Sequence, residues 1–273
     1  MFVNKIYGDP EQFDGPHLVL ATIFFGFQIY CDFSGYSDIA IGAARVMGYD
    51  LMKNFRRPYA ARSVADFWRR WHISLSTWFQ DYIFNPLYFY ISKFKALKNL
   101  DTKKKHWLSF IVSIILGEAL LGLWHGADWT FVLFGLYYAF FIILYYATRK
   151  WWDKMFVWLQ TGITFTIVTV GWVFFRANTP GDAHYIITNL FKNWDIAAWN
   201  DIAINVAGRK NLLIILLSVV LIEMIQWIHV RKNIHRIIDN LNIFFRWSLY
   251  YALIFAILLF GVFGGAKFIY FDF

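Results

Sequence analysis

The chain has 273 residues, of which 59% are hydrophobic, 22% aromatic and 16% charged, and its formal net charge is +8. Soluble domains are about 45–50% apolar and about 25% charged, and the apolar excess here lies in runs of roughly 20 residues, the length that crosses a bilayer. This composition excludes an ordinary soluble protein and predicts an all-α, polytopic integral membrane protein. The single cysteine, Cys31, excludes an internal disulfide framework and a cysteine-based zinc site.

The predicted spans begin with residues 18–47, whose second half is interrupted by polar side chains and forms either one helix or two shorter pieces. Within this segment Asp38 and Arg45 are seven residues apart, so on a helix they share a face and are able to pair. The other predicted spans cover residues 107–124, 130–147, 155–175, 211–230 and 247–264.

Residues 48–106 form a basic, amphipathic segment that we expect on the cytoplasmic face. Residues 71–91 are expected to dip into the bilayer and return, because Asn85-Pro86 disfavours a straight span. With this topology 19 of the 26 basic residues lie on one side of the membrane, which the positive-inside rule assigns to the cytoplasm. The positive charge therefore indicates topology rather than nucleic-acid binding. We treat residues 1–273 as a single membrane domain.

Two histidines are candidates for chemistry. His125 lies between two apolar runs, and His72 lies where the basic segment enters the aromatic stretch. An ionisable side chain at membrane depth is costly to keep, and an imidazole titrates near neutrality, so both suit general acid/base catalysis. The structural alternatives are a hydrogen-bonded core histidine for His125 and interfacial anchoring for His72. The histidine spacing does not fit a helical zinc site, so we predict no metal.

Six strings in chain order carry a resemblance to a known family. They are QIYCDFSGYSDIAIG (28–42), NFRRPY (54–59), DFWRRWHISLSTWF (66–79, with Asp81-Tyr82 following), LGLWHGADWTF (121–131), GWVFFRA (171–177) and FIYFDF (268–273). Together they resemble the membrane-bound O-acyltransferases, in the branch of the alginate O-acetyltransferase and the D-alanyl-lipoteichoic acid transferase. The family usually has several helices before the first string, so the resemblance implies a chain lacking its N-terminal helices.

The resemblance implies helices around a transmembrane tunnel, with His125 as the catalytic histidine and His72 on the cytoplasmic side. It also implies acyl transfer from a cytoplasmic thioester, acetyl-CoA or an acyl carrier, with no permanently bound cofactor. His125 would act as general base or position the hydroxyl, and His72 would position the thioester or polarise its carbonyl. We assign substrate binding to Asp38, Arg69, Arg70, Trp124 and Ser74, with the two arginines as candidates for donor phosphates.

The favoured activity is O-acetylation of an exported cell-envelope polysaccharide of the alginate type. The implied setting is the bacterial inner membrane, with membrane lipid, the donor, the exported polysaccharide and an extracytoplasmic acyltransferase protein as partners. The alternatives are transfer of D-alanyl or another acyl group to an envelope polymer, and a non-catalytic membrane channel or scaffold.

Overall fold

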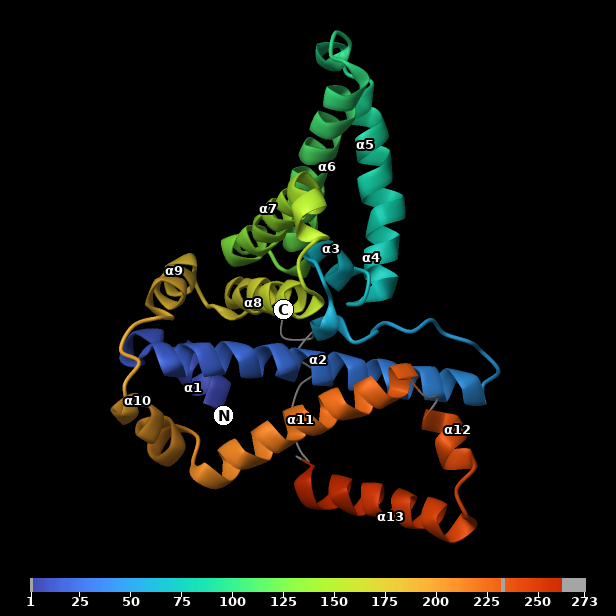
Figure 1. The fold of residues 1–273 in the computed structure, drawn as a ribbon, viewed down its shortest axis with the longest axis vertical. Helices are drawn as coiled ribbons and strands as arrows, with labels where there is room; N and C mark the ends of the chain where they lie inside the picture. Colours follow the sequence, from blue (N-terminus) through green and yellow to red (C-terminus); the bar gives the residue numbers. More distant parts are fainter. Residues whose placement is uncertain (1, 232–233, 262–273) are drawn as a thin grey trace. The chain divides into compact units, whose positions relative to one another are not determined.

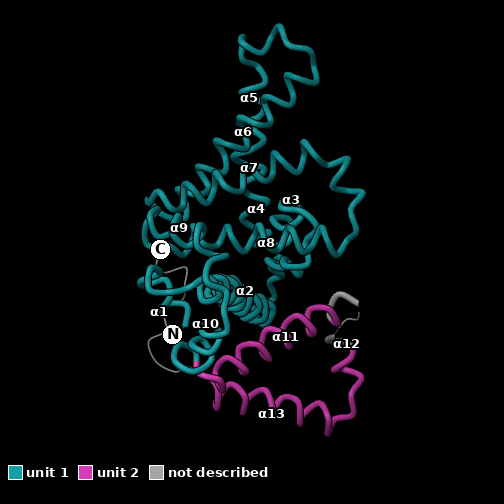
Figure 2. The backbone as a smooth tube through the Cα atoms, turned by 60° about the vertical axis from the view of Figure 1, so that its left-hand side comes forward, with its two compact units in different colours: residues 1–207 teal, residues 208–273 magenta. Residues whose placement is uncertain are grey.

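The computed structural model describes residues 2–231 and 234–261 (Figure 1). The string at 268–273 lies outside them. The chain divides into two compact units, residues 1–207 and 208–273, shown in Figure 2. The described residues contain helices and no strand, as the composition predicts.

The described residues of the first unit form ten α-helices, joined by 3-10 and π turns. Its α-helices are α1 (Phe2–Gly8), α2 (Gly15–Val46), α3 (Val64–Trp68), α4 (Ile73–Phe79), α5 (Asn85–Ser92), α6 (Thr102–His125), α7 (Trp129–Trp152), α8 (Val157–Arg176), α9 (Pro180–Asn189) and α10 (Ile196–Asp201). The turns between them are η1 (Pro10–Gln12), η2 (Pro58–Ala60), η3 (Gln80–Phe84), η4 (Lys95–Leu97) and η5 (Ile202–Val206).

The second unit contains α11 (Arg209–Arg231), α12 (Ile234–Asp239) and α13 (Ile243–Phe260). Among the described residues, six helices are long and apolar enough to cross a membrane: α2, α6, α7, α8, most of α11, and α13. They match the six spans predicted from the sequence. The spanning parts of α11 and α13 bury none of their residues.

The first span is one continuous helix. The 32 residues of α2 begin after Asp14, with Pro16 in the first turn, where a missing N–H costs no hydrogen bond. The predicted Asp38–Arg45 pair is absent, since Arg45 Nε instead lies 3.7 Å from Asp50 Oδ1. Seven residues of helix rise about 10 Å, whereas the turn after α2 brings Asp50 back towards Arg45.

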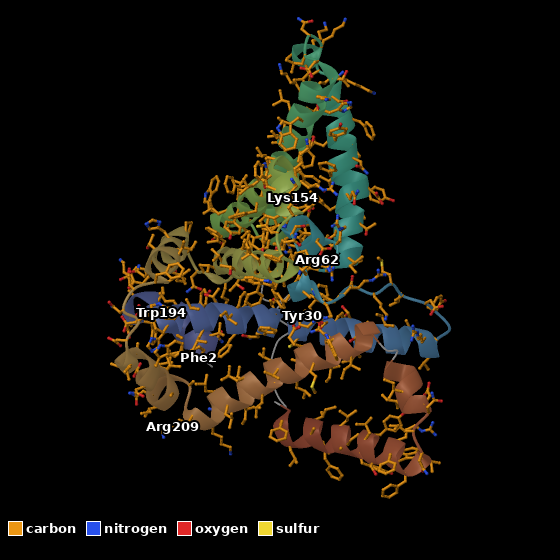
Figure 3. All side chains as sticks on the ribbon, in the orientation of Figure 1. Phe2, Tyr30, Arg62, Lys154, Trp194 and Arg209 are labelled. Atoms are coloured by element: carbon orange, nitrogen blue, oxygen red, sulfur yellow. The ribbon has the colours of Figure 1, made fainter. Side chains whose placement is uncertain are left out.

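The basic segment reverses direction at His72, not in the middle of residues 71–91. Its inward leg starts at Arg62, which is labelled in Figure 3. The Arg62 carbonyl accepts a 2.7 Å hydrogen bond from Trp152 Nε1 at the end of α7. The leg ends near the start of α7, where the Trp68 and Phe134 ring centroids are 6.3 Å apart. The outward leg then runs without reversal through α4, η3 and α5.

The outward leg stays helical through Asn85-Pro86 because η3 is a π turn. A π turn re-registers the hydrogen bonds of a helix and accommodates a residue that lacks an N–H. The leg packs antiparallel to α6, as shown by the Tyr88 hydroxyl, 2.5 Å from His106 Nδ1, and by Phe84 beside Phe110 (Figure 1). The inward leg therefore begins beside the end of α7, and the outward leg ends beside the start of α6.

Small residues allow α6 and α7 to pack in close contact. A Cβ on Gly135 would lie 2.0 Å from the Glu118 carbonyl oxygen, and a Cβ on Gly122 would lie 2.2 Å from the Phe131 carbonyl oxygen. Such close approach is how membrane helices gain packing energy, because lipid supplies no hydrophobic driving force between them. The interface fixes the position of His125, the last residue of α6.

A cluster of aromatic side chains forms the centre of the first unit. Trp71 and Trp172 are almost fully buried and their ring centroids are 4.9 Å apart, while Phe134 stacks on Trp172 at 5.8 Å. Tyr30 of α2 joins the cluster from the other side, 6.0 Å from Trp71. The cluster links the inward leg to α2, α7 and α8, and it holds the backbone on both sides of the candidate site.

Candidate active site

His125 lies at the C-terminal end of α6, against aromatic rings. Its ring centroid is 5.2 Å from that of Phe175 and 5.9 Å from that of Phe134, in edge-to-face arrangements. Gly126 follows with an extended backbone, and a Cβ there would lie 2.4 Å from the Phe131 ring. The glycine after the histidine is therefore required for packing, since it lets Phe131 fit under the end of the helix.

His72 lies at the reversal between the two legs, immediately before α4. Its backbone has φ +43°, a left-handed conformation that costs a non-glycine residue about 1 to 3 kcal/mol. Its ring contacts Phe33 of α2 edge to face, with centroids 4.6 Å apart. Burial lowers the pKa of His72 to about 4, so the imidazole is neutral at physiological pH.

The fold brings the two histidines to one aromatic cluster although they are 53 residues apart in the sequence. Both are attached to the aromatic cluster, His72 through its neighbour Trp71 and His125 through Phe134. Two imidazoles attached to one cluster can act on the two reactants of a group transfer.

Asn54, which the sequence analysis missed, holds the backbone and a side chain beside His72. Its carbonyl accepts from the Ile73 N–H at 3.0 Å, and its Oδ1 accepts from the Ser74 N–H at 3.1 Å and the Ser74 hydroxyl at 2.6 Å. Its amide nitrogen lies 3.5 Å from the hydroxyl of Ser37, a buried residue of α2. These bonds satisfy the first N–H groups of α4, which has no side-chain cap of its own.

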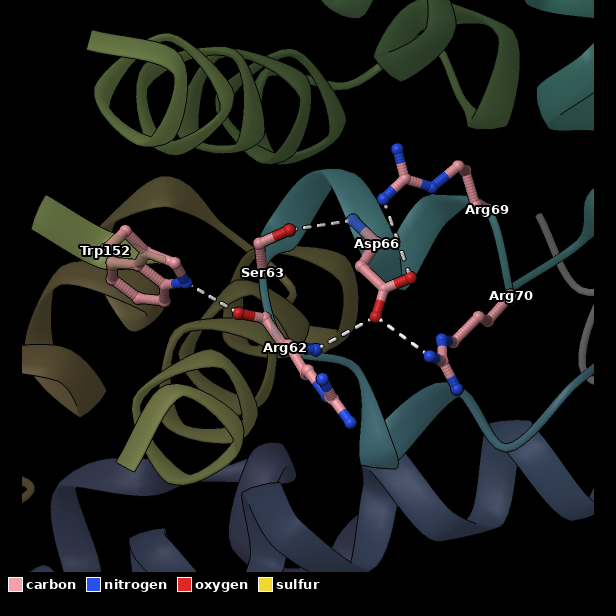
Figure 4. A network of polar contacts seen from close by, with 6 residues as sticks. All are labelled: Arg62, Ser63, Asp66, Arg69, Arg70 and Trp152. Carbon is pink, nitrogen blue, oxygen red and sulfur yellow. Dashed lines mark hydrogen bonds and ion pairs between the residues drawn. The ribbon is translucent and has the colours of Figure 1, made fainter. Parts of the chain in front are cut away.

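Arg69 and Arg70 share one carboxylate, that of Asp66 (Figure 4). Arg70 Nη2 lies 3.0 Å from Asp66 Oδ2, and Arg69 Nη2 lies 3.6 Å from Oδ1. The Arg62 N–H also donates to Asp66 at 3.0 Å. Burial would raise the pKa of Asp66, but these hydrogen bonds and the two positive charges lower it below its ordinary value. Arg69 remains the more exposed of the pair and carries the charge available to an anion.

We predict that Asp66→Asn destabilises the protein by about 2 kcal/mol at pH 7, because charged hydrogen bonds are lost and two arginines lose their counter-ion. A lowered folded-state pKa means that this stabilisation is present above pH of about 4 and is lost as the pH falls through the folded value. Unfolding midpoints in one detergent should therefore differ at pH 7 and converge in acid.

The matched control is Asp81→Asn, at an exposed carboxylate of the outward leg. A midpoint for Asp66→Asn equal to that of Asp81→Asn at pH 7 would show that the Asp66 network contributes nothing to stability.

The remaining predicted binding residues differ in accessibility. Asp38 is exposed on α2, Trp124 is 58% exposed beside His125, and Ser74 is half-buried with its hydroxyl on Asn54. Their role in substrate binding stays a prediction. Within residues 2–231 and 234–261, no group of three or more histidine, cysteine or acidic side chains is arranged to hold a metal ion.

Comparison with known proteins identifies the family of the chain. The membrane-bound O-acyltransferase family matches residues 10–179. Among curated proteins, the chain is similar to a probable alginate O-acetylase of Azotobacter vinelandii (36% identical, 66% of this chain and 34% of the relative) and to a peptidoglycan O-acetyltransferase of Helicobacter pylori (37%, 63% and 31%). It is also similar to a teichoic acid D-alanyltransferase of Bacillus subtilis (34%, 54% and 36%).

The chain spans about a third of the length of these curated relatives. The family match nevertheless covers more than half of the chain, including both histidines, the Asn54 contacts and the aromatic cluster. The resemblance found in the motifs is thereby confirmed, and the chain is a multi-pass membrane protein that belongs to the membrane-bound O-acyltransferase family.

Proposed function

We propose that the chain is an O-acyltransferase that moves an acyl group from a cytoplasmic thioester to a hydroxyl of an exported cell-envelope polysaccharide. The observation that carries this proposal is the placement of His72 and His125 against one aromatic cluster in a protein of this family. The thioester, either acetyl-CoA or an acylated carrier protein, is a substrate, and the bilayer lipid is the surrounding solvent.

The proposed chemistry uses one imidazole at each reactant. His125 accepts the proton of the acceptor hydroxyl as its oxygen attacks the thioester carbonyl carbon. The tetrahedral intermediate then collapses, the C–S bond breaks, and the proton passes to the departing thiolate. The products are an ester and a free thiol. His72 contacts the donor on the cytoplasmic side, and general acid/base catalysis of this kind contributes roughly 10²- to 10⁴-fold in rate.

Charge supports the proposed orientation. Arg62, the α5–α6 connection with its lysines and the basic end of α7 lie at one end of the first unit, as the contacts of Trp152 and His106 indicate. By the positive-inside rule this end faces the cytoplasm, in a bacterial inner membrane. An anionic donor would meet Arg69 there. His125 lies at the other end of α6 from these lysines, nearer the exported acceptor.

The transferred group is acetyl in our preferred assignment, because the relatives named for O-acetylation cover more of this chain than those named for D-alanylation. D-alanyl transfer is the second candidate, supported by the Bacillus subtilis relative. An extracytoplasmic partner protein that completes transfer to the polymer is part of the proposal.

The test is to express the chain in cells and measure the acetate and D-alanine released by mild base from surface polymers. We expect acetate above the vector control. D-alanine alone would establish the second candidate, and neither acyl group above background would contradict the proposed transferase activity and favour a channel or scaffold.

A further inference from the structure

The hydrogen bonds around Ser74 determine which nitrogen of His72 carries the proton. A backbone N–H can only donate, so the side-chain atom of Asn54 that lies 3.1 Å from the Ser74 nitrogen must be the amide oxygen. This contact fixes the orientation of the Asn54 amide, which is otherwise an inference from the surrounding network.

The same oxygen lies 2.6 Å from the Ser74 hydroxyl oxygen. An amide oxygen has no proton to give, so the hydroxyl proton must lie in this short contact. Ser74 has one hydroxyl proton, and it is therefore already donated to Asn54. Its remaining lone pair can only accept.

The next contact in the chain joins the Ser74 hydroxyl oxygen to His72 Nδ1 at 3.4 Å. Because the hydroxyl can only accept here, Nδ1 must be the donor. Burial keeps the imidazole neutral, so it carries a single N–H. Placing that N–H on Nδ1 leaves Nε2 as an unprotonated nitrogen with a free lone pair.

We propose that Asn54 is a positioning residue that, through Ser74, holds His72 as the Nδ1-protonated tautomer and presents Nε2 to the substrates as a hydrogen-bond acceptor or base. The proposal deepens the proposed function. Its catalytic consequence rests on that function, whereas the assignment of the tautomer rests only on the hydrogen bonds. His72 then binds a hydroxyl or amide N–H of a substrate and does not polarise the thioester carbonyl by donating to it.

The location of Asn54 explains why the arrangement persists despite the left-handed backbone of His72. Asn54 ties the outward leg to α2, since it bonds Ile73 and Ser74 and approaches Ser37. Ring contact with Phe33, also on α2, restrains the imidazole from another side. Catalytic histidines act efficiently when a second group fixes the tautomer in this way.

The test measures the tautomer directly, by NMR of the full chain in lipid nanodiscs with ¹⁵N-labelled histidine. The His72 signals are assigned by their absence in His72→Ala. The protonated and unprotonated nitrogens of a neutral imidazole have well-separated shifts. We expect His72 protonated on Nδ1 in the parent, the same in Ser74→Thr, which keeps the hydroxyl, and a shift towards protonation on Nε2 in Ser74→Ala and Asn54→Ala.

The matched control is Ser76→Ala, because that hydroxyl is two residues further along α4 and donates to the Trp71 carbonyl instead. An Nε2-protonated His72 in the parent, or a tautomer unchanged in both Ser74→Ala and Asn54→Ala, would overturn the proposal.

Ester formation measured on the same samples separates this proposal from the proposed function. We expect kcat to fall roughly 10- to 100-fold in Asn54→Ala and in Ser74→Ala, and to stay near the parental value in Ser74→Thr. A tautomer that changes without any change in kcat would overturn the positioning role. A parent that forms no ester but shows the expected tautomers would contradict the proposed function and leave the assignment of the proton intact.

Discussion

Replacing His125 by alanine is expected to lower ester formation by roughly 10²- to 10⁴-fold, and replacing His72 by a similar factor, because each imidazole acts on one reactant. Groups that act as one unit are strongly non-additive. The double variant should therefore be slowed by little more than the worse single variant, provided that the residual rate is above background. Initial rates on membranes with matched protein levels provide the measurement.

The control for these variants is His184→Ala, since His184 is exposed on α9, a helix that contributes no residue to the candidate site. Multiplicative losses in the double variant would show that the two histidines act independently. Parental rates in both single variants would remove them from the catalytic site altogether.

The second large effect concerns stability, at the α6–α7 interface. Gly135→Ala places a methyl carbon 2.0 Å from the Glu118 carbonyl oxygen, so the two helices must move apart. Overpacking usually costs 1–3 kcal/mol, and a clash with backbone, which cannot rotate away, is expected to cost about 3 kcal/mol or more. Thermal unfolding followed by circular dichroism in one detergent should show a clear decrease in the midpoint.

Gly162→Ala is the matched control, because Gly162 is also in a spanning helix and a Cβ there meets nothing within 4 Å. This variant should be neutral or slightly stabilising, since alanine favours helix over glycine. Equal midpoints for the two variants would mean that α6 and α7 do not pack as closely as the structure has them.

The spans could be predicted because their signal is strong and local. Twenty apolar residues in a row have few alternatives to a membrane helix, and α2 continues as one helix through its polar second half, most of which is exposed. The position of the reversal at His72 was not predictable. Asn85-Pro86 is the local signal for a break, but a π turn absorbs it, whereas the reversal depends on contacts with distant helices.

The candidate site was only partly predictable for a related reason. His125 and His72 are unusual in their apolar surroundings, so the sequence marks them. Asn54 and Asp66 are the first residues of two of the quoted strings, NFRRPY and DFWRRWHISLSTWF, but the strings do not show which hydrogen bonds the two side chains make. Asn54 bonds Ser74, 20 residues away, which only the fold brings into range, whereas the arginines paired with Asp66 are only three and four residues further along the chain. The prediction of an Asp38–Arg45 pair was wrong because two residues on the same face of a helix can still be too far apart along the helix axis.

The most direct test of the central claim, acyl transfer through His125, is to count both products with the purified chain. The chain in nanodiscs is given an acetyl thioester and a hydroxyl-bearing oligosaccharide, and free thiol and ester are measured together. One thiol per ester is predicted for the parent, with both almost absent in a folded His125→Gln variant. Ester formation by that variant at the parental rate would contradict the claim.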